Sequence, residues 1–226
     1  MKLTALALRH FAAVALSATA ACPAAAQQPA STAVSAAAPR AAAAHGPAIT
    51  ASLRRGEIDI VSLPDPHTGV QLARATVIVD APAEVAMRIV TDYAHYSDFL
   101  PNFRASRVLS RRGNNAIVYL EARAVHNTTT IWAQLRIFQR RPAGQTQIIE
   151  GRMMQGNVAR MDARWEVTPI DDGARSLVTF QFLIDPDLPF PDSIVSQENR
   201  RVTSRAVDAL RRRATEPRFA VARSGR

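Results

Sequence analysis

The stretch Asp80–Phe103, DAPAEVAMRIVTDYAHYSDFLPNF, contains two runs of apolar residues separated by a break. Pro82 suits the first position of a helix, where no backbone N–H is needed, and Glu84 complements the positive end of the helix dipole. The apolar residues that follow recur on one helical face. Pro101 disfavours helical geometry at the residue before it. The stretch therefore predicts two short amphipathic helices, which either cover a sheet or form a lid over a cavity.

The segments on both sides of this stretch alternate between apolar and polar residues, as strands with one buried face do. A hairpin is predicted before it, with strands over 56–62 and 70–80. Further strands are predicted after it, over 105–109, 116–125, 128–140, 146–154, 158–167 and 176–184. Turn residues separate these segments, and an antiparallel sheet with one apolar face must bury that face against another layer.

One long amphipathic helix over 192–213 supplies that layer. Its apolar stripe comprises Val195, Val202, Ala206, Ala209 and Leu210, and the opposite face carries Arg200, Arg201, Arg205, Arg211 and Arg212. The sequence therefore predicts an α+β fold of the helix-grip type. A curved antiparallel sheet of about seven strands would wrap around the long C-terminal helix, with two short helices after the first long strand.

The N-terminus has the pattern of a secretory signal peptide. Lys2 and Arg9 precede an apolar run that is too short to span a bilayer, and small residues end at Ala26. We expect a signal peptide over 1–26, cleavage near Ala26 and a periplasmic or secreted protein, with lipoprotein processing at Cys22 as the alternative. Cleavage near Ala26 removes the single cysteine of the sequence, and with it disulfide and thiol chemistry.

The remaining chain divides by composition into three parts. Residues 27–50 are rich in alanine and proline and predict a disordered linker. The range 51–213 is long enough for one domain with a sizeable core, and 214–226 predicts a basic disordered tail. The formal net charge is +9, and the charge of the mature chain is concentrated beyond Asn199. In an exported protein this indicates an anionic membrane surface or an acidic partner rather than nucleic acid, or an ordinary solvated face.

Two blocks of residues resemble a known family. The first consists of Asp80-Ala81-Pro82-Ala83-Glu84, Asp92-Tyr93, Tyr96, Phe99-Leu100-Pro101 and Arg107-Val108-Leu109, and the second of Gly156, Met161, Trp165 and Thr168-Pro169. With the terminal helix, they resemble the polyketide cyclase/dehydrase and coenzyme Q-binding family of the START-like (helix-grip, Bet v1-like) superfamily. The resemblance covers about 70–213. The chain departs from the family in its export signal and in Gly156-Asn157-Val158, where Gly-Pro-Phe is usual.

The resemblance implies a deep apolar cavity between the sheet and the last helix, gated near the first helices, for a lipid, quinone or polyketide. The candidate cavity residues are Leu120, Ala122, Leu135, Ile137, Met153, Met161, Trp165, Phe180, Phe182, Val195 and Val202. The candidate gate residues are Tyr93, Tyr96, Phe99, Leu100 and Phe103. Alanine is frequent on the inward face of the sheet. Either the helix packs very close there, or a cavity on the order of a few hundred Å³ remains.

Reactive groups form no recognisable catalytic constellation. The sequence has no Gly-x-Ser-x-Gly motif, and its histidines have no partner at a metal-like spacing, so we expect neither a metal nor a cofactor. Glu150 and Arg123 are possible polar anchors for a ligand head group if their side chains face the cavity. His95 lies near the predicted gate.

The sequence favours a periplasmic binding or carrier protein for a hydrophobic small molecule. Two alternatives remain open. One is a cyclase or dehydratase that uses Glu150 or Arg123 in the cavity, so catalysis is undecided. The other is a module that binds an acidic partner through the arginine-rich C-terminus. The sequence identifies neither the ligand nor the oligomeric state.

Overall fold

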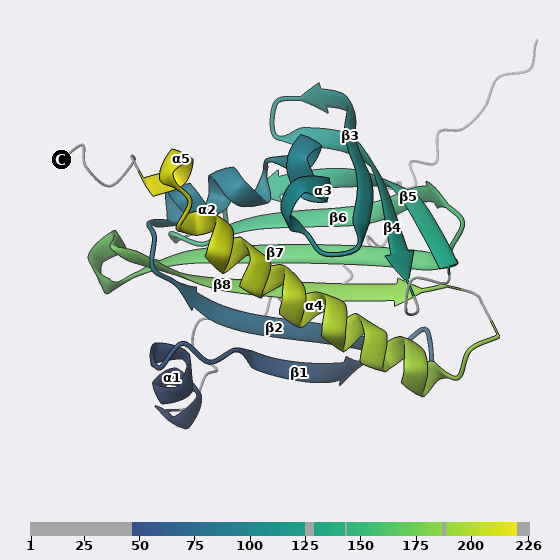
Figure 1. The fold of residues 1–226 in the computed structure, drawn as a ribbon, viewed down its shortest axis with the longest axis horizontal. Helices are drawn as coiled ribbons and strands as arrows, with labels where there is room; N and C mark the ends of the chain where they lie inside the picture. The colour runs from purple at the N-terminus through teal and green to yellow at the C-terminus, as the bar shows by residue number, and fades with distance from the viewer. Residues whose placement is uncertain (1–46, 125–128, 143, 187–188, 221–226) are drawn as a thin grey trace, which may run out of the picture. The chain divides into compact units, whose positions relative to one another are not determined.

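The computed structural model describes residues 47–124, 129–142, 144–186 and 189–220, and Figure 1 shows a sheet with one long helix lying across it. The helical elements are α1 (Pro47–Arg54), α2 (Ala83–Val90), the 3₁₀ turn η1 (Tyr93–His95), α3 (Tyr96–Phe99), the 3₁₀ turn η2 (Asp171–Gly173), α4 (Asp192–Ala214) and α5 (Pro217–Ala220). The strands are β1 (Asp59–Pro64), β2 (Gln71–Val79), β3 (Phe103–Arg112), β4 (Asn115–Ala124), β5 (Thr129–Arg140), β6 (Gln147–Gly156), β7 (Arg160–Ile170) and β8 (Arg175–Asp185).

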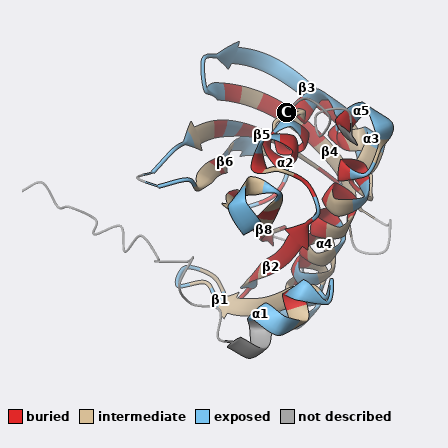
Figure 2. Cartoon of the chain, turned by 90° about the vertical axis from the view of Figure 1, so that its left-hand side faces the viewer, coloured by how far each residue is buried: buried red, intermediate tan, exposed pale blue. Residues whose placement is uncertain are grey.

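The strands of the described ranges form one eight-stranded antiparallel sheet in the order β1-β2-β8-β7-β6-β5-β4-β3. The predicted alternation holds in β7, where Met161, Trp165 and Val167 are buried. Figure 2 shows buried residues on the strands that lie beside α2 and α4. The sheet and its long C-terminal helix confirm the predicted α+β helix-grip fold, with eight strands rather than about seven.

Helix α4 packs against β2 and β8. Asp192 stands in its first turn and arginine side chains stand in its last turn, which suits the helix dipole at both ends. Ala73 and Ala75 of β2 are fully buried. Because alanine adds little bulk to the sheet, it lets the helix approach closely at this position.

A buried asparagine fixes α4 to the sheet. Asn199 is 0% exposed, and its side chain accepts a hydrogen bond from the backbone N–H of Ile184 at 3.2 Å. The same amide donates to the carbonyl oxygens of Ile184 and Gln71, both at 3.2 Å. The side chain thus bonds backbone groups of both β2 and β8. Buried polar groups need such partners, so these bonds define where the helix sits along the strands.

The stretch between β2 and β3 folds as the sequence indicates. Helix α2 starts after Pro82 and buries most of its apolar residues. Thr91 ends it, η1 and α3 follow, and α3 ends before Pro101. The backbone of Asn102 then adopts a φ of 70°, a left-handed conformation that asparagine tolerates better than most residues. This bend turns the chain directly into β3.

Structured residues extend past both predicted ends of the domain, and the buried face of α4 is wider than the predicted stripe. Helix α1 begins at Pro47, within the segment predicted as linker. At the other end, Ala214 closes α4 and Phe219 of α5 is buried, so the fold extends into the predicted tail. The buried face of α4 also includes Asn199, Thr203, Val207, Arg213 and Ala214, which the predicted stripe omits. The predicted signal peptide, Cys22 and Ala26 lie outside the described residues, and in that described part of the chain no helix is long and apolar enough to cross a membrane.

Candidate functional site

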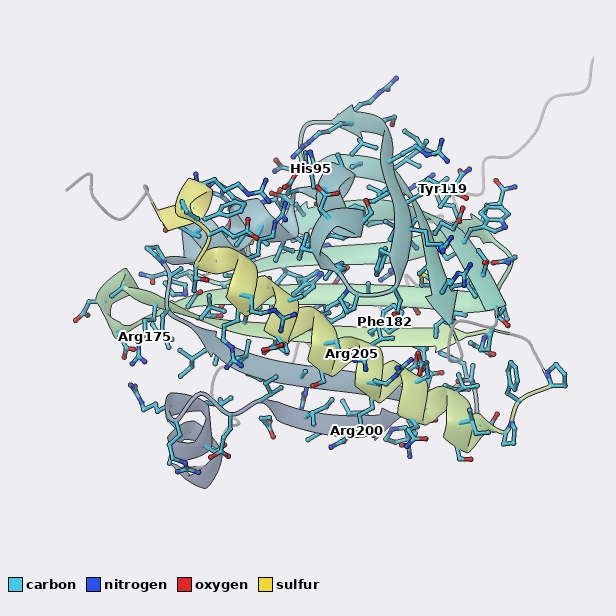
Figure 3. All side chains as sticks on the ribbon, in the orientation of Figure 1. His95, Tyr119, Arg175, Phe182, Arg200 and Arg205 are labelled. Carbon is cyan, nitrogen blue, oxygen red and sulfur yellow. The ribbon has the colours of Figure 1, made fainter. Side chains whose placement is uncertain are left out.

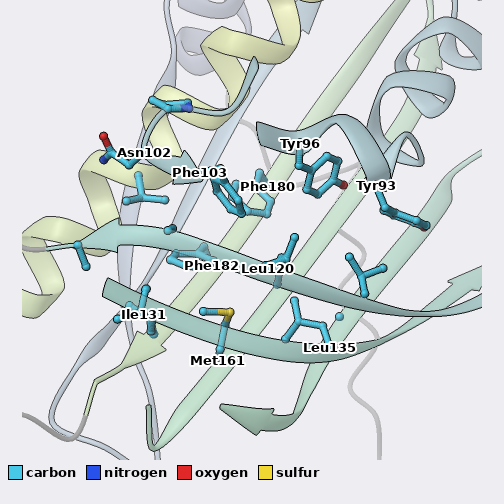
Figure 4. A pocket seen from close by; sticks show the side chains of 18 of the residues that line it. Tyr93, Tyr96, Asn102, Phe103, Leu120, Ile131, Leu135, Met161, Phe180 and Phe182 are labelled. Carbon is cyan, nitrogen blue, oxygen red and sulfur yellow. The ribbon is translucent and has the colours of Figure 1, made fainter. Parts of the chain in front are cut away.

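A cavity of about 90 Å³ lies between the sheet, α4 and the bend that joins α3 to β3 (Figure 4). The predicted cavity residues that line it are Leu120, Ala122, Leu135, Ile137, Met161, Trp165, Phe180, Phe182 and Val202. Further apolar lining residues, which the prediction missed, are Pro101, Val118, Ala124, Ile131, Ile149, Gly151, Ala163 and Ile184. The walls are therefore mostly hydrocarbon and aromatic.

Two predicted cavity residues lie elsewhere. Met153 is partly buried and packs against the main core, beside a register shift between β5 and β6. Val195 packs near the start of α4 in a separate small cluster with Val70 and Leu183. Val195 shares the buried side of α4 with Val202, but it lies about two helical turns away. The helical stripe alone did not show where along α4 the cavity ends.

The cavity is smaller than the few hundred Å³ that the alanine-rich sheet suggested. Aromatic rings occupy part of this space, where Trp165 and Phe180 stack with centroids 4.0 Å apart and Phe182 lies beside Phe180. A liquid water molecule occupies about 30 Å³, whereas sites for drug-sized ligands span about 300–1,000 Å³. A lipid-sized ligand must therefore displace lining side chains. Gly151, Ala122 and Ala163 mark where the wall has little side-chain bulk.

The predicted gate divides into lining and supporting residues. Tyr93, Tyr96 and Phe103 line the cavity. Phe99 and Leu100 do not line it. Phe99 instead contacts Tyr96 edge to face at 5.7 Å, and Leu100 is buried in the core. The rings of Tyr96 also meet those of Tyr93 and Phe103 edge to face, so one aromatic cluster links η1, α3 and the start of β3.

Both gate tyrosines are neutral at ordinary pH. Burial raises the pKa of Tyr93 to about 12, although the nearby charge of Arg111 opposes the shift. Burial also raises the pKa of Tyr96 well above its usual value, and the neighbouring Tyr93 and Asp92 further disfavour its ionisation. The Tyr96 hydroxyl donates to the carbonyl oxygen of Val90 at 2.5 Å. That bond ties α3 to the end of α2.

A buried arginine connects the gate to the C-terminal end of α4. Arg213 is 2% exposed, and its Nη2 lies 3.1 Å from Oδ2 of Asp92. Its guanidinium carbon lies 4.3 Å from the ring centre of Phe99 and 5.6 Å from that of Phe219. His95 Nδ1 lies 2.5 Å from the other carboxylate oxygen of Asp92. We call this set of five residues the Arg213 cluster.

Ionised Asp92 is the centre of the Arg213 cluster. Burial alone would raise the pKa of Asp92, but hydrogen bonds and charge from His95 and Arg213 outweigh it and lower the pKa. Arg213 Nε is buried without a hydrogen-bond partner within the described part of the chain. A buried charge is stable only when it is well paired. The position of the gate and the pairing of Arg213 therefore depend on each other.

Besides the two tyrosines, the polar or charged residues that border the cavity are Asn102, Arg123 and Glu198. Glu198 of α4 lines it and forms two hydrogen bonds with Arg201, with Nε at 2.8 Å and Nη2 at 2.5 Å. Asn102 lines it at the bend before β3. Arg123 also borders it, where its backbone N–H donates to the Asn102 carbonyl oxygen at 2.9 Å. Strand alternation places the Arg123 side chain on the outer face with Glu121.

Glu150, the other predicted anchor, does not line the cavity. Its neighbours Ile149 and Gly151 do, so the Glu150 side chain projects from the opposite face of β6. There Arg164 Nη1 donates to Oε1 at 2.5 Å. Arg140 Nη2 lies 3.2 Å from Oε2, close enough for charge attraction but without hydrogen-bond geometry. The sequence left the orientation of Glu150 open, because β6 has no strong alternation from which to assign its faces.

The arginine face of α4 is only partly available to a partner. Arg201 pairs with Glu198, and both Arg211 and Arg212 pair with Asp208. No ion pair among the described residues involves Arg200 or Arg205, which lie on the outer side of α4 (Figure 3). The described residues contain no group of three or more His, Cys, Asp or Glu side chains that could hold a metal ion.

Comparison with known proteins relates this architecture to one family. Residues 79–211 match the family described as polyketide cyclase / dehydrase and lipid transport. No curated protein sequence matches the chain significantly. Several solved structures are similar in fold.

The STAR-related lipid transfer protein of Xanthomonas axonopodis has a TM-score of 0.63 and 16% identity, over 70% of this chain and 94% of that one. A START superfamily protein of Mycobacterium smegmatis has a TM-score of 0.53 and 20% identity, over 63% and 95%. Human StAR-related lipid transfer protein 5 has a TM-score of 0.61 and 12% identity, over 70% and 81%. At these identities the similarity establishes the shared fold.

Proposed function

Because the chain belongs to the polyketide cyclase/dehydrase and lipid transport family, we propose that it binds and carries a hydrophobic small molecule. The observation that carries this proposal is the cavity between sheet and α4, whose walls are mostly apolar and whose border includes the polar residues Asn102 and Glu198. Such a site favours a ligand with an apolar body and a small polar end, such as a lipid, quinone or polyketide-like compound. Burial of apolar surface supplies about 25 cal/mol per Å².

Ligand entry requires movement of the gate. The cavity of about 90 Å³ is too small for such a ligand, and Tyr93, Tyr96 and Phe103 cover it from the α3 side. The sheet strands are fixed by continuous pairing, whereas η1 and α3 are short and held by side-chain contacts. We therefore place the opening at the range 93–103, with the aromatic cluster separating from the strands below it.

Uptake of lipid by the purified protein tests the proposal. The protein is incubated with a total bacterial lipid extract and analysed by native mass spectrometry. The expected result is a one-to-one complex with an extract component. An Ala163→Phe variant provides the control, since a ring at that position occupies the cavity and should prevent uptake. A folded wild-type protein that takes up nothing, or an Ala163→Phe variant that binds equally well, contradicts the proposal.

The catalytic alternative invoked Glu150 and Arg123, and strand alternation places both side chains on the outer face of the sheet. Glu150 lies on the outer face of the sheet, and Glu198 is paired with Arg201. Tyr93 and Tyr96 have raised pKa values and are therefore poor bases at neutral pH. No observation favours a cyclase or dehydratase over a carrier.

Export to the periplasm and attraction to an anionic membrane belong to the same proposal. The signal-like pattern ending at Ala26 supports export, with Cys22 lipidation as the alternative, and the mass of the mature N-terminus distinguishes them. Arg200 and Arg205, which form no ion pair with any residue that the structure describes, support long-range attraction to an anionic surface. An acidic protein partner would use the same charges. Loss of a partner after truncation beyond about Thr215, with ligand uptake intact, would favour that alternative.

A further inference from the structure

The edge strand β3 has an unusual surface. Beyond Ser106, each of its residues is exposed, and Figure 2 shows this part of β3 in the colour of exposed residues. Val108 is 37% exposed and Leu109 is 51% exposed. Between and beside them stand the exposed side chains of Arg104, Arg107, Arg111 and Arg112. We call this surface, Arg104 to Arg112, the β3 edge.

The arginines of the β3 edge have no acidic partner in the described part of the chain. Within the described ranges, no ion pair involves Arg104, Arg107, Arg111 or Arg112. Arg107 lies 4.9 Å from the ring centre of Tyr119, and Arg111 lies 5.9 Å from that of Tyr93. These contacts orient the two guanidinium groups without neutralising them. The β3 edge therefore combines uncompensated positive charge with exposed aliphatic side chains.

We propose that the β3 edge docks the protein on the surface of an anionic phospholipid bilayer. Arginine attracts anionic head groups, and aliphatic side chains at the same edge can enter the head-group region. Side chains from both faces of a strand are accessible at a sheet edge, so a flat surface meets all of them together. Arginines at an edge also discourage strand pairing between molecules. Preventing strand pairing explains the arginines, but it gives no reason for the exposed aliphatic side chains of Val108 and Leu109.

The β3 edge lies on a strand that begins at the cavity wall. Asn102 and Phe103 line the cavity, and β3 begins at Phe103. The buried Ser106 hydroxyl donates to the carbonyl oxygen of Tyr93, and Arg111 lies over the Tyr93 ring. A bilayer bound at β3 therefore contacts the strand that supports the gate. This link to ligand exchange rests on the proposed carrier function, whereas docking itself does not.

A bilayer fits the β3 edge better than an extended acidic peptide. A peptide added as a further strand needs a regular row of backbone groups. In β3 the register with β4 shifts between Val108 and Ser110, which interrupts that row where Leu109 is exposed. A head-group surface has no register, and it accommodates the projecting side chain. The chemistry therefore indicates lipid rather than peptide.

Vesicle sedimentation with paired variants tests the docking surface. The vesicles contain phosphatidylcholine alone or phosphatidylcholine with phosphatidylglycerol. Each basic residue near an anionic surface contributes about fivefold in affinity, so Arg104→Gln with Arg112→Gln should weaken binding to the anionic vesicles by about 25-fold. The matched control is Arg200→Gln with Arg205→Gln on α4. It removes the same charge away from the proposed contact and should weaken binding by less than about fivefold.

A second pair of variants reports insertion. Leu109→Trp should shift its fluorescence to the blue on anionic vesicles. Ile194→Trp on α4, which replaces a side chain of 40% exposure, should not. The proposal is overturned if the α4 charge variant loses as much affinity for anionic vesicles as the β3 charge variant, or more. A blue shift only at position 194 also overturns it. So does wild-type binding to polyglutamate as tight as to anionic vesicles, or equal binding to neutral and anionic vesicles.

The carrier proposal is tested separately in the same variants. Ligand uptake from solution, measured by native mass spectrometry, should be unchanged in Arg104→Gln with Arg112→Gln. Vesicle binding without any ligand uptake would contradict the carrier function and leave the docking surface intact. Ligand uptake without vesicle binding by the wild-type protein would contradict the docking surface and leave the carrier function intact.

Discussion

Replacing Arg213 by methionine tests whether the Arg213 cluster stabilises the closed gate. Breaking a fully buried ion pair costs about 3–5 kcal/mol. The side chain of Asp92 is 27% exposed and also contacts His95, so water and histidine partly replace the lost arginine and the cost falls to about 2 kcal/mol. Loss of the cation–π contact with Phe99, at 4.3 Å, adds about 1 kcal/mol. The expected loss is about 3 kcal/mol, or roughly 6–12 °C in Tm.

Urea denaturation of a double-mutant cycle measures this coupling. The variants are Arg213→Met, Asp92→Asn and the two together. The double variant should lose less stability than the sum of the single variants, because it leaves no unpaired charge and methionine fills the space beside Phe99. Arg212→Met is the matched control. Its side chain is 66% exposed, so its effect should stay within about 0.5 kcal/mol.

The same variants connect stability with function. If the Arg213 cluster restrains the gate, uptake of a hydrophobic dye should be faster in Arg213→Met than in the wild-type protein or Arg212→Met. Additive stability losses in the cycle would show that Asp92 and Arg213 do not act together. Unchanged uptake rates together with the expected stability loss would show that the cluster stabilises the fold without restraining the gate.

Three further predictions follow from buried contacts. Asn199→Ala should cost about 2 kcal/mol in urea denaturation, because it leaves backbone groups of two strands unpaired; a loss below about 0.5 kcal/mol would contradict that role. Burial opposes ionisation of Asp65, but hydrogen bonds from its own turn and the charge of Arg160 lower its pKa below 3.8. Its contribution to stability should therefore be complete above pH 3.8 and be lost as pH falls through the lowered pKa. In Asp65→Asn, the free energy of unfolding should fall less steeply over this acidic range. Ala75→Leu should destabilise by about 1–3 kcal/mol through overpacking, whereas Ala163→Leu should be neutral or stabilising and reduce ligand uptake. Similar changes in stability for Ala75→Leu and Ala163→Leu would refute the distinction between close packing at Ala75 and open space at Ala163.

Alternation and helical periodicity predicted the fold because burial imposes them on every regular element. The strand β7 shows this, since its buried Trp165 and Val167 occupy the positions that its pattern indicated. The buried face of α4 was less predictable. Asn199 and Arg213 are polar residues that tertiary contacts bury, and the sequence alone places such residues on the exposed side.

The candidate site depended on information that local patterns do not contain. Glu198 lines the cavity one helical turn from Val202, so its spacing was a usable signal, but a charged residue was not included in an apolar stripe. Glu150 was a possible anchor on a strand whose weak alternation left its orientation open, and the structure places it on the other face. The partner of Arg213 was beyond prediction, because Asp92 lies far away in the sequence.

The alanine-rich face of the sheet shows why both interpretations of small residues were needed. At β2, fully buried Ala75 lies where α4 contacts the sheet, so small side chains there let the helix pack closely. At β6 and β7, Gly151 and Ala163 pair across the strands and line the cavity, so small side chains there leave space. A Cβ atom at Gly151 would lie 3.0 Å from Cδ1 of Ile137, which shows how little room the wall retains. The difference arises from the diagonal path of α4, which approaches the sheet at β2 and β8. The same residue type therefore supports close packing under the helix and cavity volume beyond it, and the position of the helix decides which.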